Sequence, residues 1–167
     1  MTRFMLQFLA VMAVLFGVEM LNPVQVAVIT PWTNMLASLS AAVMSSFDPD
    51  VFSQGRVLFS QATGFGVSIE AGCNGIEAVI ILVAGIVVFP ASWRLKLTGI
   101  AIGIVAVQVA NLLRVISLYY LGKWNFEVFE FAHLYLWQAL IMLDVLVVWL
   151  LWIRAVAKRS GAGLAVG

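Results

Sequence analysis

The chain has 167 residues, of which 63% are hydrophobic and only 10% are charged, and its formal net charge is +1. Soluble domains carry about 25% charged residues, so this composition excludes an ordinary soluble protein, and without a basic cluster we expect no nucleic-acid partner. The mean hydropathy of +1.08 likewise indicates a membrane protein. A single cysteine excludes an intrachain disulfide. One cysteine and one histidine are too few for a structural zinc site, so we expect neither metal nor cofactor.

Four apolar stretches are long enough to cross a bilayer, which takes about 20 mostly apolar residues in a helix. They cover residues 4–21, 74–90, 95–121 and 131–153 of a single membrane domain, residues 1–167. The predicted fold class is therefore an all-α integral membrane protein. The first stretch also has the basic start and apolar run of a signal peptide. No small-x-small cleavage site follows it cleanly, so we expect it to be retained.

The positions of the basic residues predict an orientation in the membrane, because Lys and Arg favour the cytoplasmic side of short loops. Basic residues precede the first stretch, flank the tight loop between the second and third, and follow the fourth. We therefore expect both termini in the cytoplasm, and residues 22–73 and 122–130 on the outer side, most simply in a bacterial inner membrane. The basic residues concerned are Arg3, Arg94, Lys96, Arg154, Lys158 and Arg159.

The long outer segment, residues 22–73, contains two patterns of its own. Apolar residues at helical spacing between Pro31 and Phe47 predict an amphipathic helix on the outer interface, with a fifth span as the alternative. Residues 65–70 alternate between apolar and small or polar residues, and residues 56–60 supply a partner strand. A small β-hairpin is therefore expected before the second span, with an edge to which an extended peptide could add.

Cys73 lies immediately before the second span, in the run Gly72-Cys73-Asn74-Gly75. Asn74 is a predicted N-cap, and Glu77 three residues later completes a variant capping box. A thiol at the positive end of a helix has a lowered pKa and is more reactive as the thiolate. A lone cysteine is also often a small buried residue, but this polar setting at the membrane boundary favours a nucleophile.

Two further residues are candidates for the same site. Arg114 lies about 10 Å inside the outer end of the third span, at 1.5 Å per residue. A charge at that depth costs roughly 2.5 kcal/mol or more on insertion scales, so such residues usually face the bundle interior and serve a site. Asn111, one turn earlier, and Gln108, one more turn back, are expected to hold the guanidinium. His133 opens the fourth span and is the one imidazole available to a cysteine that needs a base.

These placements predict one pocket at the outer side, in which Cys73 attacks a carbonyl, His133 moves protons and Arg114 stabilises the oxyanion. Glu77 is a possible partner of Arg114. We expect Asp144 to lie too deep for catalysis and Glu19 to lie near the pocket rim.

The runs Gly72-Cys73-Asn74-Gly75 and Asn111-Leu112-Leu113-Arg114, followed by His133, resemble the exosortase/archaeosortase family over about residues 55–153. The resemblance implies a membrane-embedded cysteine peptidase or transpeptidase, of the EC 3.4.22 type. Its substrates would be exported proteins with a C-terminal sorting signal made of a motif, a transmembrane helix and a basic tail. Carried over to matching positions, it implies Cys73 as nucleophile with Arg114 and His133 as partners.

The chain has fewer spans than most members of that family and looks most like its minimal subtype, exosortase H. That subtype implies an IPTLxxWG-like substrate motif, with a PEP-like motif as the alternative. The competing hypothesis is a non-enzymatic transporter or accessory subunit. The patterns of aspartyl, rhomboid-like and zinc intramembrane proteases are absent from the sequence. The sequence leaves the oligomeric state open.

Overall fold

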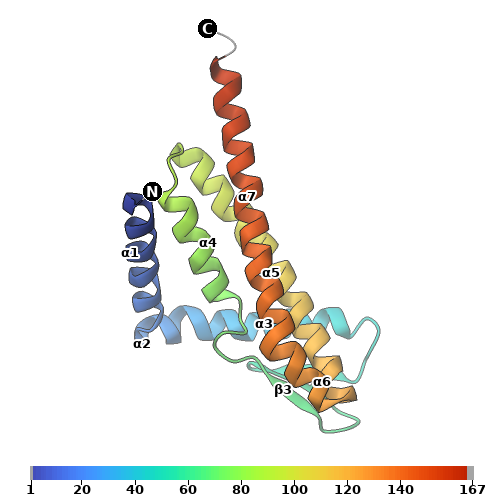
Figure 1. Cartoon of the computed structure of the whole chain (residues 1–167). Coiled ribbons are helices and arrows are strands. Elements are labelled where there is room, and N and C mark those ends of the chain that lie inside the picture. Colours follow the sequence, from blue (N-terminus) through green and yellow to red (C-terminus); the bar gives the residue numbers. More distant parts are fainter. Residues whose placement is uncertain (1, 165–167) are drawn as a thin grey trace.

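The computed structural model describes residues 2–164, and it is mostly helical. Figure 1 shows α1, α4, α5 and α7 running roughly alongside one another, while α3 lies across the ends of α1 and α4, and α5 and α7 extend beyond it. The bounds of the longer helices are α1 Thr2–Glu19, α3 Thr30–Met44, α4 Ile76–Val88, α5 Trp93–Trp124 and α7 Trp137–Leu164. The short helical elements are α2 Asn22–Val24, η1 Gln25–Ile29, α6 Phe126–Phe131 and η2 Ala132–Leu136, of which η1 and η2 are π-helical.

Within the described residues, four helical stretches are long and apolar enough to cross a membrane, so the predicted helical membrane fold is confirmed. Three of them correspond to the spans expected at residues 4–21, 95–121 and 131–153. The fourth is the stretch that ends in α3, and α4 falls short of the length criterion. The four stretches are Thr2–Glu19, Asn22–Met44, Trp93–Trp124 and Phe126–Arg159.

Helix α4 is shorter than the span expected at residues 74–90. Its 13 residues rise about 20 Å, less than the roughly 30 Å of a hydrocarbon core. Pro90 ends the helix, because the residue before a proline avoids the α region, and Phe89 is extended with φ −67° and ψ 136°. The positive-φ glycine at position 75 delays its start. Helix α4 nevertheless lies beside α1, α5 and α7.

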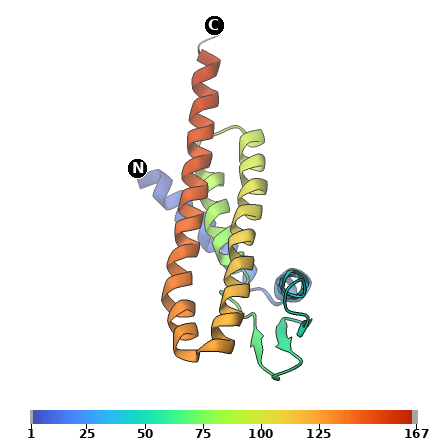
Figure 2. The same ribbon diagram turned by 90° about the vertical axis from the view of Figure 1, so that its right-hand side faces the viewer.

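The stretch Asn22–Met44 is long enough for the fifth span considered above, but its direction differs from that of the other helices. Figure 2 shows α3 nearly end-on while α5 and α7 run along the page. That direction is the one expected of a helix lying along the interface. The predicted helix at residues 31–47 therefore starts earlier, through α2 and η1. Pro31 cannot donate a backbone hydrogen bond, and the π-helical turn η1 immediately precedes it.

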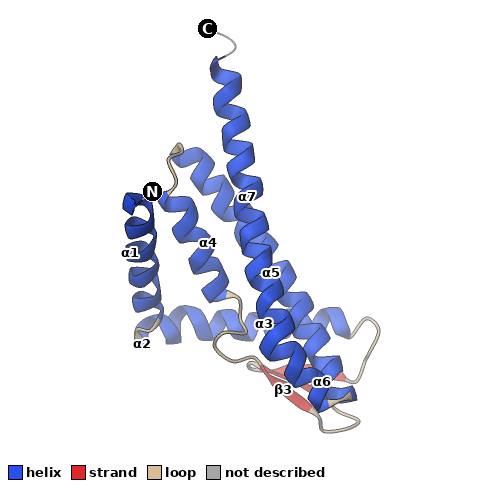
Figure 3. Ribbon diagram, viewed as in Figure 1, coloured by secondary structure: helices blue, strands red, loops and turns tan. Residues whose placement is uncertain are grey.

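The predicted hairpin is present as β2 (Val57–Ser60) and β3 (Gly66–Ser68), and a further strand, β1 (Val51–Gln54), extends it to a three-stranded antiparallel sheet. The turn between β1 and β2 starts with Gly55, whose φ of 57° suits a two-residue hairpin turn with glycine first. Figure 3 shows this sheet at the same end of the molecule as α6.

Two buried clusters hold the structure around the site. One joins the sheet to α3 and α5 through Leu58, Ile69, Met44 and Tyr119. The other joins α4, α5 and α7, and includes Leu82, Val107 and Val145. The sheet thereby packs on the C-terminal half of α5, and α4 packs on α5 and α7.

Candidate active site

The turn between β3 and α4 carries the candidate nucleophile. Gly72 and Gly75 adopt left-handed conformations with φ of 82° and 77°, which only glycine adopts without strain. These two glycines therefore determine the path of the backbone on both sides of Cys73. Cys73 itself is partly buried and, in the described chain, forms no disulfide.

The predicted capping box at this turn is wrong. The N-cap of α4 is Gly75, one residue later than expected. The side chain of Asn74 accepts a hydrogen bond from the N–H of Ile76 at 3.0 Å. Glu77 reaches past Asn74 and accepts from the N–H of Gly72 at 2.6 Å. The carboxylate of Glu77 thus closes the turn around Cys73. This role depends on a bend in the backbone before α4, which the spacing of residues in the sequence does not reveal.

Asn74 anchors the same turn to α3 and is 1% exposed. Its side-chain Nδ2 donates to the hydroxyl of Thr33 at 3.3 Å, and its backbone carbonyl accepts from the indole N–H of Trp32 at 3.2 Å. Both partners are side chains of α3, which is far from Asn74 in the sequence. Asn74 therefore positions the turn.

Arg114 faces the interior, as predicted, with only 3% of its surface exposed. One guanidinium nitrogen, Nη1, donates to the carbonyl of Gly72 at 3.1 Å, and the other, Nη2, lies 3.6 Å from Sγ of Cys73. The possible ion pair between Arg114 and Glu77 does not form within the described residues. Arg114 therefore directs its positive charge at the thiol and at the backbone beside it.

Cys73 and His133 line one pocket of about 190 Å³. The segment Val67–Ala71 and Phe129 also line it. The His133 ring stacks on Phe129, with centroids 5.6 Å apart and planes 2° from parallel. Its Nδ1 is buried, and no residue in the described part of the chain bonds to it. The imidazole thus has a nitrogen available for a proton-transfer partner.

The electrostatics of the thiol differ from the prediction. Burial raises the pKa of Cys73, the Arg114 guanidinium lowers it, and Glu77 and Glu70 raise it; the net pKa lies above the ordinary value. The helix position of Cys73 suggested the opposite direction. At neutral pH the resting group is therefore mainly the neutral thiol, which needs a base to become a nucleophile.

Labelling of Cys73 by a maleimide is expected to be slow at neutral pH and to accelerate as the pH rises, because the thiolate is the reactive form. Arg114→Gln should shift the pH–rate curve to higher pH, since it removes the interaction that lowers the pKa of the thiol. The measurement is the labelling rate in membrane fragments between about pH 6 and pH 10, a range that brackets the ordinary thiol pKa. Identical curves for the two proteins would contradict this assignment.

A second polar cluster lies on the same face of α5, one and two helical turns before Arg114 in the sequence. The side-chain amides of Gln108 and Asn111 are buried and lack hydrogen-bond partners within the described residues, as does Nε of Arg114. Both amides lie against the first turn of α4: a Cβ on Gly75 would be 2.7 Å from Nε2 of Gln108 and 3.1 Å from Nδ2 of Asn111. Gly75 is thus required for close approach as well as for its positive φ.

Arg114 donates no hydrogen bond to Asn111 or Gln108 within the described residues, so the expectation that these two amides hold the guanidinium is wrong. Unpaired buried polar groups cost roughly 1–3 kcal/mol each, so this cluster is unusual. The signal that identified both amides in the sequence is their i, i+3, i+6 spacing with Arg114.

The two remaining acidic candidates lie outside the pocket. Glu19 is buried near the end of α1 but does not line the pocket, so its expected place at the rim is wrong. Asp144 is partly buried within α7 and also lies away from the pocket, as expected of a residue too deep for catalysis.

In a comparison with protein families, residues 1–152 match the family model described as Transmembrane exosortase (Exosortase_EpsH). The matched residues include Cys73, Arg114 and His133 and both runs of sequence that surround the first two. No curated protein and no solved structure matches the chain.

Proposed function

Because the chain belongs to the transmembrane exosortase family, as its motifs predicted, we propose that it is a membrane-embedded cysteine protease or transpeptidase acting on C-terminal sorting signals. The observation that supports this most directly is the placement of the Arg114 guanidinium 3.6 Å from the Cys73 sulfur, beside a pocket shared with His133. A thiol, a cation and an imidazole at one pocket supply the groups that acyl transfer requires.

In the proposed first step, His133 accepts the thiol proton and Sγ of Cys73 attacks the scissile carbonyl carbon. A C–S bond forms while the carbonyl π electrons move to oxygen, and Arg114 stabilises that oxyanion. Collapse of the intermediate breaks the C–N bond. The imidazolium of His133 gives its proton to the leaving amine, so the transmembrane part of the substrate departs with a new amino terminus and the rest remains as a Cys73 thioester.

The second step consumes the thioester. Water or an acceptor nucleophile loses a proton to His133 and attacks the thioester carbon, the C–S bond breaks, and the thiolate of Cys73 recovers the proton. Water gives a free acid, which is proteolysis, whereas an amine or hydroxyl acceptor gives an adduct, which is transpeptidation or a related transfer. Both routes use the same enzyme groups and return them to their starting state.

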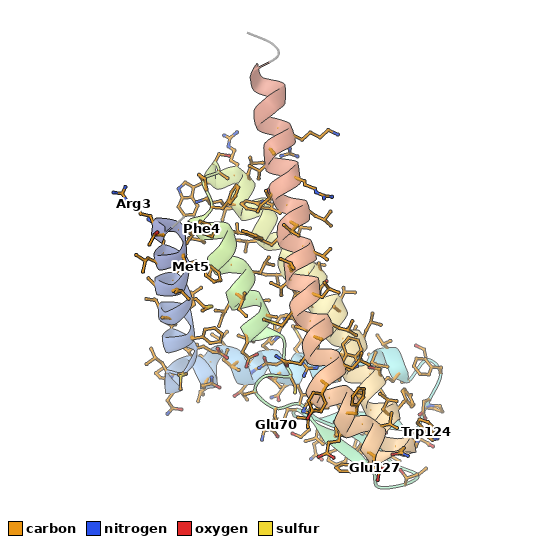
Figure 4. The ribbon with its side chains drawn as sticks, viewed as in Figure 1. Arg3, Phe4, Met5, Glu70, Trp124 and Glu127 are labelled. Carbon is orange, nitrogen blue, oxygen red and sulfur yellow. The ribbon has the colours of Figure 1, made fainter. Side chains whose placement is uncertain are left out.

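The charge distribution supports placing the site on the outer side of a bacterial inner membrane. Figure 4 shows Arg3 at one end of the molecule and Glu70 and Glu127 at the other, where Trp124 also lies. Basic residues favour the cytoplasmic side, so the end with the Cys73 pocket would face outward. An exported protein anchored by its C-terminal helix would present its motif at this end.

The test uses a reporter with an exported domain, an IPTLxxWG-like motif, a transmembrane helix and a basic tail, co-expressed with the chain. Wild type is expected to shorten the reporter, and mass spectrometry of the product identifies the cleaved bond. The matched control is a reporter with the motif residues scrambled, and a PEP-like reporter tests the alternative motif. If all three reporters keep full length while the chain is present in the membrane, the proposed function is wrong.

A further inference from the structure

We propose that the outer edge of β3 binds the substrate as an added, parallel β-strand, which carries the scissile bond to Cys73. The proposal rests on the proposed function, because it concerns how the same pocket takes its peptide. The occupant is the extended segment immediately before the cleavage point.

The edge of β3 that faces away from β2 is available for pairing. The sheet order is β1-β2-β3, so β3 has one strand neighbour. The carbonyl of Phe65 accepts from Ser60, and the N–H of Ile69 donates to Arg56, so alternate residues from Phe65 to Ile69 bond to β2. In an antiparallel ladder the residues between them direct N–H and C=O to the opposite side. These residues are Gly66 and Ser68, and both are exposed.

The pocket lies along this edge. Residues of the segment Val67–Ala71, Phe129 of α6, His133 of η2, and Val115 and Leu118 of α5 line it together. A paired strand lies about 4.8 Å from its neighbour. A peptide at that distance from β3 would therefore lie in this pocket.

Cys73 lines the same pocket, five residues beyond Ser68 along the chain. A peptide that is bonded to the edge and lies in this pocket would therefore lie beside the thiol. Backbone hydrogen bonds would hold it irrespective of side chain, and pockets for alternate side chains would provide selectivity. Because the lining of the pocket is largely aliphatic and aromatic, we expect apolar substrate residues at alternate positions.

The parallel direction follows from the path of the enzyme chain. From β3 the backbone passes through Cys73 directly into α4, and so from the sheet into the helical bundle. A substrate whose exported domain precedes its transmembrane helix runs in the same direction. The other edge of the sheet lacks these properties, since β1 packs beside α3 and lies away from the pocket.

Ser68→Pro removes the outward N–H of β3, and proline is tolerated at edge strands because no ladder bond is lost. We expect reporter processing to fall at least roughly fivefold, the effect of one hydrogen bond. Ser53→Pro is the matched control, because Ser53 is also a serine on an edge strand whose N–H points away from β2. Equal maleimide labelling of Cys73 in all proteins shows that the site remains folded.

Disulfide crosslinking tests the strand itself without requiring catalysis. Ser68→Cys is combined with Cys73→Ala, and single cysteines are scanned through the reporter motif. Crosslink yields that peak at every second position support the proposal. Yields that are uniform or absent along the motif overturn it, as does full processing by Ser68→Pro. A reporter that wild type leaves uncut counts against the proposed function, and the crosslinking pattern still decides the strand.

Discussion

Replacing Cys73 with alanine is expected to reduce reporter processing to the background rate, a loss of at least about 10⁴-fold, as for removal of a nucleophile from other covalent enzymes. The reason is that the chain contains one cysteine, so no second thiol can form the acyl intermediate. The measurement is the initial rate of reporter shortening in membranes that contain equal amounts of each protein. The folding cost should be small, because Arg114 retains its bond to the carbonyl of Gly72.

Cys73→Ser is the matched control for shape, since it keeps a polar atom beside the guanidinium but offers a much weaker nucleophile. It should be nearly as inactive as alanine while showing the same membrane level and the same elution volume in detergent. Processing by Cys73→Ala at the wild-type rate would exclude Cys73 as the nucleophile. A non-thiol mechanism or a non-enzymatic role would then have to replace the proposed one.

Replacing Arg114 with alanine is expected to lower processing by about 10² to 10³-fold, the size of effect seen when an oxyanion stabiliser is removed. Two losses combine: the thiol pKa rises further, and the developing oxyanion loses its cation. Arg114→Lys should recover part of the activity because it keeps the charge. It should not recover all of it, because one ammonium group cannot reproduce the planar fork that contacts both Gly72 and Cys73.

Membrane insertion gives an internal control for the Arg114 variants. An arginine inside an apolar span disfavours insertion, so Arg114→Ala should reach at least the wild-type level in the membrane. Arg154→Ala is the matched arginine control, because Arg154 is exposed in the C-terminal part of α7, and the C-terminal end of α7 lies away from the sheet. It should process the reporter normally. Full activity of Arg114→Ala at high pH and neutral pH alike would show that the guanidinium takes no part in the reaction.

The long apolar helices could be predicted because the bilayer sets a minimum length for any span, and that length is visible in one dimension. The expected stretches at residues 4–21 and 95–121 correspond to α1 and α5 for this reason. The predicted length of helix α4 was too great at both ends. Its start depends on the positive φ of Gly75, and its end depends on the effect of Pro90 on the residue before it.

The sheet was predicted in part. The alternation in residues 65–70 revealed β3, whereas β1 has only four residues and a burial pattern that a helix or loop could equally show. Its strand character depends on pairing with β2, which is a long-range property of the fold. The capping prediction failed for a related reason. The spacing of Asn74 and Glu77 fitted a capping box, but the turn redirected Glu77 to Gly72.

Sequence alone determined that this is a helical membrane protein and singled out its candidate site residues, because a thiol, an imidazole and a deeply placed guanidinium stand out by type in an apolar chain. Only the tertiary structure decided their relations: that Arg114 reaches Cys73, that His133 shares its pocket, and that Gln108 and Asn111 lie against Gly75. It also reversed the expected direction of the Cys73 pKa. Helix position is a local property, whereas burial depends on segments that are distant in sequence.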